Sequence, residues 1–300
     1  RLVRQTPGVR AFVGVGPASA SARGYGSAFL PAIFGGSKVG RGGRSSRAAR
    51  LGSAESVPDI KAAVEKHKQR AQLDYIQKLN QGLLEKDQYQ PGVEGIIESY
   101  ELAFRMQDAM PEIMDISKET PATLELYGAD SEPTQTFGQQ CLLARRFAEA
   151  GVRFIEVTHG NWDQHANLTA DHKARAESCD KPIAGLLKDL KQRDMLKDTL
   201  VIWGGEFGRT PAAQGADGRN HNNKGYTTWM AGGGVKGGFS YGSTDEYGYE
   251  AIEKLCHIHD WHATILHLLG LDHERLTYRY AGRDFRLTDV SGVVAQDIIA

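Results

Sequence analysis

The sequence predicts an α/β fold with a mostly parallel β-sheet and helices on both faces. Three observations lead to this class: short apolar segments alternate with amphipathic helical segments, the alternation runs from residue 152 to residue 269, and polar loops follow the strands. Strands that alternate with helices are typical of parallel sheets, because each helix returns the chain to the same end of the sheet.

The first half of the chain is predicted to be mainly helical after an irregular start. Residues 1–54 contain no acidic residue, eight Arg, one Lys and many small residues, without clear periodicity. Two interpretations stay open for them: a surface loop, or an electropositive wall beside an anionic substrate. From Asp59 onward, apolar residues recur at helical spacing, with Ser56 as the expected N-cap and Pro58 suited to the first helical position.

The remaining elements are predicted from the same periodicities. Helices are expected at 93–107 and 133–150, the second beginning near Thr134 or Thr136. The elements that follow are a strand at 152–157, a long amphipathic helix at 168–193, strands at 199–203 and 226–231, a turn at 232–234 and a helix at 260–269.

Three segments follow from this pattern: an irregular Gly- and Arg-rich segment at 1–55, a helical subdomain or insertion at 56–130, and an α/β core at 131–300. A chain of 300 residues is long enough to bury such a core. The net charge of -1 argues against a nucleic-acid-binding protein, because affinity for a phosphate backbone requires a basic excess. No segment reaches the roughly 18 apolar residues expected of a membrane span. The three cysteines lack CxxC spacing, so buried or semi-buried thiols are expected.

The first group of candidate ligands follows the strand at 152–157. Nine of the ten histidines lie at His159 or later, and Asp163 and His165 stand two residues apart. In an extended loop this spacing places both side chains on one side, where they can bind one cation. A loop held only by hydrogen bonds would show the same pattern, and that alternative stays open.

A second polar loop, from Gly204 to Pro211, follows the strand at 199–203. The crevice beyond the carboxyl ends of parallel strands is the usual ligand site of such sheets. Glu206 can serve as a metal ligand or a base, and Arg209 can hold a sulfate or phosphate through its guanidinium fork. The alternative is a Glu206–Arg209 ion pair that only shapes the loop.

A third loop, from Gly218 to Gly225, places His221 between Arg219 and Lys224. This surrounding suits a neutral imidazole ligand beside anion-binding groups, although a solvated histidine would fit the same sequence. Together the three loops supply mixed nitrogen and oxygen ligands, which predict a divalent metal, preferably Zn²⁺ or Mn²⁺, with Ca²⁺ or Mg²⁺ as alternatives. Such a metal could activate water or stabilise the oxygens around phosphorus or sulfur.

A fourth group contains His257, His259, Asp260 and His262, and we interpret it as structural. Asp260 is expected to be the N-cap of the helix at 260–269. His262 would then lie in the first helical turn and not in a metal site.

Several motifs resemble a bacterial family known as domain of unknown function 1501, whose members are often described as sulfatase-like. The resemblance covers nearly the whole chain, and the glutamate-containing motif is quite specific. The motifs are Gly26-Ser-Ala-Phe-Leu-Pro31, Thr136-Phe-Gly138 with Cys141-Leu-Leu-Ala-Arg-Arg146, Trp162-Asp-Gln-His165, Gly205-Glu-Phe-Gly-Arg-Thr-Pro211, Gly218-Arg-Asn-His221 and Gly282-Arg-Asp-Phe-Arg-Leu-Thr-Asp289.

The family is similar to the alkaline-phosphatase-like superfamily, which implies a three-layer α/β/α sandwich with metals at the strand ends. By this resemblance, Asp163, His165 and His221 correspond to the first metal site of the superfamily. Glu206 corresponds to a carboxylate of the second metal site. Phe207 stands where that second site commonly has a histidine, which is a departure from a two-metal arrangement.

The resemblance also implies parts that this sequence does not show. Relatives usually have Asp where Asn220 stands, and they carry an earlier Gly-Gly-x-Ser stretch and an Asp-rich first strand near the nucleophile. We therefore expect the sandwich to be incomplete at the N-terminus and the nucleophile to be missing. Relatives commonly begin with a twin-arginine export signal, which implies a periplasmic or secreted location in bacteria.

The first functional hypothesis is a metal-dependent hydrolase of sulfate or phosphate esters, acting on an anionic small molecule or polysaccharide. In it, Asp163, His165 and His221 bind one cation. Glu206 assists a second cation or acts as a base, and Arg209 holds the anion. The second hypothesis is a non-catalytic protein that binds anionic, sulfated glycans on the same fold. The third is an inactive fragment, in which an unpaired sheet edge could lead to a homodimer.

Overall fold

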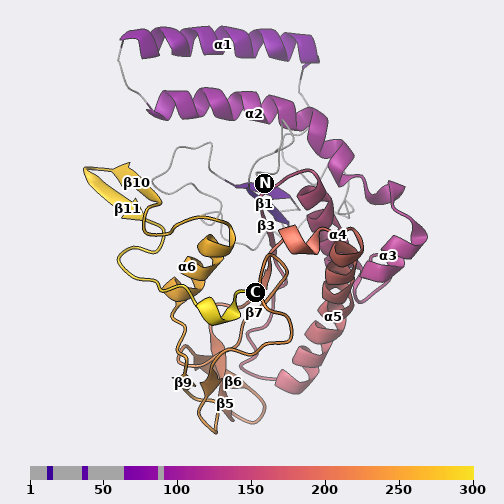
Figure 1. Ribbon diagram of the computed structural model, residues 1–300. Coiled ribbons are helices and arrows are strands. Elements are labelled where there is room, and N and C mark those ends of the chain that lie inside the picture. Colours follow the sequence, from indigo (N-terminus) through magenta and orange to yellow (C-terminus); the bar gives the residue numbers. More distant parts are fainter. Residues whose placement is uncertain (1–11, 16–35, 40–63, 87–90) are drawn as a thin grey trace. The chain divides into compact units, whose positions relative to one another are not determined.

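The computed structural model describes residues 12–15, 36–39, 64–86 and 91–300 (Figure 1). Two compact units divide the chain. The first consists of Arg1–Gly160 with Ser178–Leu186, and the second consists of Asn161–Glu177 with Leu187–Ala300. The predicted cap Ser56, Pro58 and the motif from Gly26 to Pro31 lie outside the described residues.

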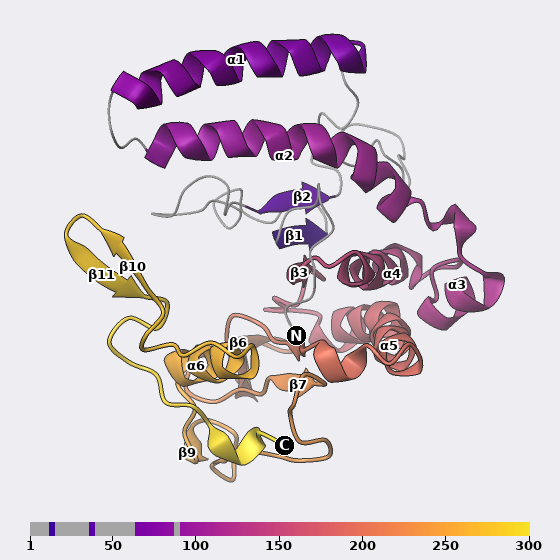
Figure 2. The ribbon, with the colours of Figure 1, turned by 45° about the horizontal axis from the view of Figure 1, so that its top comes forward.

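A three-stranded parallel sheet lies in the first unit. Strands β1 (Phe12–Val15), β2 (Ser37–Val39) and β3 (Phe154–Val157) are hydrogen-bonded in the order β2-β1-β3, and Figure 2 shows β1 in the middle. The described residues of the segment predicted as irregular, 1–55, thus include strands β1 and β2, which the sequence analysis did not predict. Strands of three or four residues are too short for a clear two-residue repeat, and their pairing with β3 depends on contacts far along the chain.

Helices cover this sheet and extend beyond it. Helix α4 packs on β1 and β3, α2 and α3 pack on α4, and α1 lies beside α2 (Figures 1 and 2). The helices predicted at 93–107 and 133–150 are confirmed, although α2 is longer than expected. Their bounds are α1 (Lys66–Lys86), α2 (Pro91–Met114), the 3-10 helix η4 (Ile116–Lys118), α3 (Pro121–Tyr127) and α4 (Gln135–Glu149).

One apolar core joins the sheet to α2 and α4. It consists of buried Val, Met, Leu and Phe side chains, and it explains why the first unit does not end at the predicted boundary near residue 130. Apolar side chains from both sides of that boundary must pack together to leave water. The buried members are Val13, Val15, Val39, Met106, Met110, Met114, Leu143, Phe147 and Val152.

Three further contacts hold α4 in the first unit. Thr134 is the N-cap of α4, but its hydroxyl donates to the carbonyl of Gly128 at 2.7 Å and so closes the turn after α3. The carboxylate of Glu119, next to η4, forms ion pairs with Arg145 at 2.8 Å and with Arg146 at 2.6 Å. The side chains of Glu119 and Arg145 are only 9% and 2% exposed, so this ion pair is shielded from water.

The second unit contains four two-stranded antiparallel sheets in its described residues. Helix α5 (Leu168–Gln192) is shared between the two units and matches the predicted helix. The sheets pair β4 (Val201–Trp203) with β7 (Trp229–Ala231), β5 (Gly208–Ala213) with β6 (Arg219–Asn222), β8 (Ser243–Thr244) with β9 (Ala251–Glu253) and β10 (Thr277–Tyr280) with β11 (Arg283–Arg286). The helical segments are η5 (Leu196–Asp198), α6 (Ile258–Leu268) and η6 (Gln296–Ile298).

The pairing of β4 with β7 differs from the expected parallel arrangement. Both strands were predicted, and both are shorter than predicted. Parallel neighbours need a long crossover, usually a helix, whereas here the β5–β6 hairpin lies between the two strands in sequence. The three-layer sandwich therefore stays a prediction.

The start of α6 also differs from the prediction. Its N-cap is His257, whose Nδ1 accepts a hydrogen bond from the backbone N–H of His259. Asp260 lies at the third helical position and accepts from the backbone N–H of His257 at 2.9 Å, which completes a capping box. The assignment of Asp260 as N-cap was wrong, because an acidic residue three positions later serves the same helix end. The placement of His262 in the first helical turn was also wrong, because α6 begins at Ile258 and its first turn ends before His262.

The thiols and the helices bear on two further predictions. Cys141 and Cys179 are buried as expected, but Cys256 is exposed because it lies in the loop that precedes α6. Among the helices that the structure describes, none has the length and apolar character needed to cross a membrane.

Candidate metal centre

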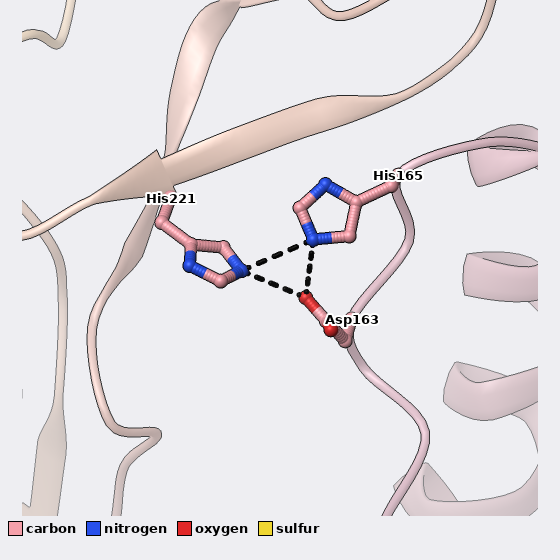
Figure 3. A group of neighbouring side chains, drawn as sticks. All are labelled: Asp163, His165 and His221. Atoms are coloured by element: carbon pink, nitrogen blue, oxygen red, sulfur yellow. Dashed lines mark hydrogen bonds and ion pairs between the residues drawn. The ribbon is translucent and has the colours of Figure 1, made fainter.

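The loop between β3 and α5 carries two of the predicted ligands. Asn161 and Asn167 flank it with left-handed backbones (φ 67° and 53°), a conformation that Asn adopts more readily than most residues. Between the two ligands, the buried Gln164 donates its amide to the carbonyl of Asn161 at 2.5 Å. With Gln164 anchored, the alternating positions of Asp163 and His165 present their side chains together (Figure 3).

The third ligand comes from a hairpin. The segments predicted as loops around Arg209 and His221 form strands β5 and β6, and these two residues face each other in register. The prediction missed the strands because a polar hairpin lacks an apolar repeat. The backbone N–H of Arg219 donates to the carbonyl of Gln164 at 3.0 Å, which joins the hairpin to the ligand loop.

Asp217 and Gly218, directly before β6, bring the hairpin close to the loop that carries Asp163 and His165. A Cβ atom at Gly218 would lie 2.0 Å from the carbonyl oxygen of His165, so this approach requires glycine. The carboxylate of Asp217 accepts hydrogen bonds from the backbone N–H and the hydroxyl of Thr169, both at 3.2 Å. Asp217 thereby caps the first turn of α5, where Asn167 makes no side-chain cap.

The three predicted ligands meet at one point (Figure 3). Nε2 of His165 and Nε2 of His221 each lie 3.0 Å from Oδ1 of Asp163, and the two nitrogens lie 3.1 Å apart. The side chains are 61%, 40% and 45% exposed for Asp163, His165 and His221, so a cation can reach them from solvent. This is the group of metal-ligating side chains that the described residues bring together.

The spacing of these atoms fits a small divalent cation. A tetrahedral zinc ion with bonds of about 2.0–2.1 Å separates its ligand atoms by about 3.3 Å, so an outward shift of a few tenths of an ångström would admit it. Two imidazoles and one carboxylate are also a ligand set that zinc accepts. The residues present therefore fit a three-ligand site that keeps a further coordination position open.

A residue that the sequence did not single out orients His165. That residue is Gln214 in the β5–β6 hairpin, whose Oε1 lies 2.7 Å from Nδ1 of His165. An amide oxygen only accepts, so this contact favours a proton on Nδ1, while Nε2 faces Asp163 and His221. Lone pairs and a carboxylate that face one another repel unless a proton or a cation lies between them. Gln214 therefore favours the metal-binding tautomer.

Arg209 contacts the same carboxylate. Its Nη1 donates to Oδ1 of Asp163 at 2.6 Å, and its Nη2 lies 3.6 Å from Oε1 of Glu206. The hydrogen bonds with His221 and with Arg209 lower the pKa of Asp163 to about 2, so this ligand stays ionised in neutral solution. Glu206 is not part of the three-residue group, and its observed partner is Arg209.

Phe207 has a position of its own in the site. Its ring lies 4.3 Å from the imidazole of His221, centroid to centroid, and the guanidinium of Arg209 lies over it at 5.5 Å. Phe207 thus packs against both His221 and Arg209. The sequence showed Phe207 only as a departure from the resembled family, because its contacts depend on the hairpin.

A cavity of about 520 Å³ lies against Arg209 in the second unit. Three of its lining residues are cationic and two are apolar. The sequence analysis missed this cavity, since its walls come from the ligand loop, the first turns of α5 and both strands of the hairpin. The lining residues are Trp162, Gln164, Leu168, Thr169, His172, Lys173, Arg209, Thr210 and Arg219.

Comparison with known proteins identifies a family. A family model described as "Protein of unknown function (DUF1501)" matches residues 3–299, which is almost the whole chain. Comparison with curated proteins gave no match, and comparison with solved structures gave none either.

Proposed function

This chain belongs to the DUF1501 family, and since it brings Asp163, His165 and His221 together, we propose that it is a metal-dependent hydrolase of sulfate or phosphate esters. The convergence of Asp163, His165 and His221 within hydrogen-bonding distance of one another supports this function. Three protein ligands with an open position are typical of catalytic zinc sites, whereas structural zinc sites are closed by four.

The surroundings of the ligand group suit an anionic ester. When bound, a divalent cation lowers the pKa of coordinated water and polarises the oxygens of the ester. Arg209 would hold the sulfate or phosphate through its planar donors. Glu206, which is 64% exposed and borders Arg209, would accept the proton of the attacking water and return it to the departing alcohol oxygen.

The hydroxyl groups of the neighbouring cavity are already engaged. Thr169 donates to Asp217, and Thr210 donates to the carbonyl of Ala212 at 3.0 Å. A water molecule is therefore a better nucleophile for this site than either threonine. The kinship with the alkaline-phosphatase-like superfamily, the three-layer sandwich and export to the periplasm or medium belong to the same proposal.

Metal analysis of the purified protein tests the first step. We expect about one zinc or manganese ion per chain, and a loss of most of it in Asp163→Asn and in His221→Ala. Asp171→Asn and His267→Ala are matched controls, because these exposed residues lie outside the ligand group. A parent protein that takes up no divalent metal would refute the proposal.

Turnover tests the second step. The metal-loaded protein should hydrolyse 4-nitrophenyl sulfate or 4-nitrophenyl phosphate, and chelation or Asp163→Asn should remove the activity. Arg209→Met should weaken substrate binding more than it lowers metal content, because Arg209 would contact the anion directly but reaches the cation site only through Asp163. Metal binding without turnover of either ester would favour the non-catalytic anion-binding hypothesis instead.

A further inference from the structure

Cationic side chains from three elements line the cavity beside the group of Asp163, His165 and His221. Lys173 from α5, Arg209 from β5 and Arg219 from β6 all line it. No carboxylate is found among its lining residues in the described part of the chain. Three cations from three elements, with an apolar wall between them, form a surface complementary to an organic anion.

These cations differ in how far their charge is already used. Arg209 is held by Asp163 at 2.6 Å and by Glu206 at 3.6 Å, so it belongs to the ligand group. Lys173 is 76% exposed, and its contact with Glu177 on the next helical turn is a loose one of 3.8 Å, a type of pair that contributes little. Arg219 uses Nη1 to reach the carbonyl of Gly218 at 2.8 Å, an uncharged partner.

The remaining wall suits a ring. Trp162 makes an edge-on contact with His172 at 5.0 Å between ring centroids, and both residues line the cavity together with Leu168. A volume of about 520 Å³ lies within the range of pockets that enclose small organic molecules. This space is larger than a lone sulfate or phosphate requires.

Arg209 links the cavity to the group formed by Asp163, His165 and His221. Arg209 lines the cavity and also donates to Oδ1 of Asp163, while Arg219 lies two residues before His221 on the same strand. A ring bound in the cavity can therefore present an attached ester to the cation.

We propose that this cavity binds the organic part of the substrate: a single sugar-sized ring that carries an anionic group of its own, held by Lys173 and Arg219. The identification of this ligand as a substrate rests on the proposed function, but its binding does not. The bound oxyanion is a sulfate or a phosphate, and Trp162 with Leu168 contacts the ring.

Titration calorimetry on chelator-treated protein tests this inference without turnover. The probes are glucose 6-sulfate and glucose 6-phosphate, with uncharged glucose and inorganic sulfate as references. We expect Lys173→Met and Arg219→Gln each to weaken binding of the better sugar anion about tenfold, as expected for one charge-assisted hydrogen bond. Lys188→Met is the control, because this exposed lysine lies on the same helix but does not line the cavity.

The ring contact has its own readout. Trp162→Ala should weaken the sugar anion and leave inorganic sulfate unchanged. Equal affinity for glucose and for both sugar anions overturns the inference. So does an unchanged affinity in both Lys173→Met and Arg219→Gln, or the absence of binding to both the chelator-treated and the zinc-loaded protein. Anion binding that depends on Lys173 and Arg219 in a protein without hydrolase activity would sustain the cavity and refute only the hydrolase.

Discussion

Replacing Gln214 with leucine removes the hydrogen-bond acceptor at Nδ1 of His165 and leaves the three predicted ligands unchanged. In the structure, Oε1 of Gln214 lies 2.7 Å from Nδ1 of His165. Leucine keeps a similar size but offers no acceptor. The imidazole then loses its preference for a proton on Nδ1, and its ring gains freedom to turn away from Asp163.

The expected size of the effect follows from this geometry. Losing the partner of a metal-ligating histidine commonly lowers metal affinity by about 10- to 100-fold. Gln214 and His165 are both exposed, so water can replace the lost acceptor. We therefore expect a loss near the lower end, about tenfold or about 1.4 kcal/mol.

Competition titration with a chromophoric zinc chelator measures this change directly. Gln77→Leu is a matched control, since it removes an amide hydrogen bond to Glu101 in the other unit. Gln214→Glu should retain zinc affinity, because a carboxylate also accepts from Nδ1. Parent affinity in Gln214→Leu would show that the observed hydrogen bond does not orient the ligand.

Three other substitutions probe the surroundings of the site and the fold. Gly218→Ala places a methyl group against the carbonyl of His165 and should lower the unfolding free energy by about 1–3 kcal/mol, measured by urea unfolding. The same change should lower metal affinity in a zinc titration, and unchanged values in both measurements would contradict the close approach. Glu119→Gln leaves Arg145 buried with a weaker partner and should cost about 3 kcal/mol in urea unfolding. Burial raises the pKa of Glu119, but the hydrogen bonds from the two arginines outweigh it, so the pKa is lowered overall. The stabilisation by the Glu119–Arg145 ion pair should therefore be present above about pH 4.5 and be lost in acid in the parent protein, whereas Glu119→Gln should lack this pH dependence. His257→Ala removes the N-cap of α6 and should lower the unfolding free energy by about 1 kcal/mol, and equal stability would mean that Asp260 alone serves that helix end.

Part of the site could be predicted from consecutive residues. The spacing of Asp163 and His165 after a strand predicted that both side chains face one side, and the structure confirms that they meet at one point with His221. The same local logic predicted α2, α4 and α5, because each buries an apolar stripe with a period of 3.6 residues.

The contact of Glu206 with Arg209 and the contact of Gln214 with His165 could not be predicted from consecutive residues. Glu206 follows β4 as expected, yet its observed partner is Arg209 and it stands apart from the three-residue group. Gln214 carries no motif, and its role follows only from a hairpin that folds back on the ligand loop.

The amino-acid sequence by itself determined where helices form, which residue types could bind a cation and the family to which the chain belongs. Tertiary structure alone decided that β1 and β2 join β3, that β4 pairs antiparallel with β7, and that a cationic cavity adjoins the ligands. The physical reason is range. Helical periodicity and loop spacing act between neighbours in the chain, whereas strand pairing and cavity walls depend on contacts between residues that only folding brings together.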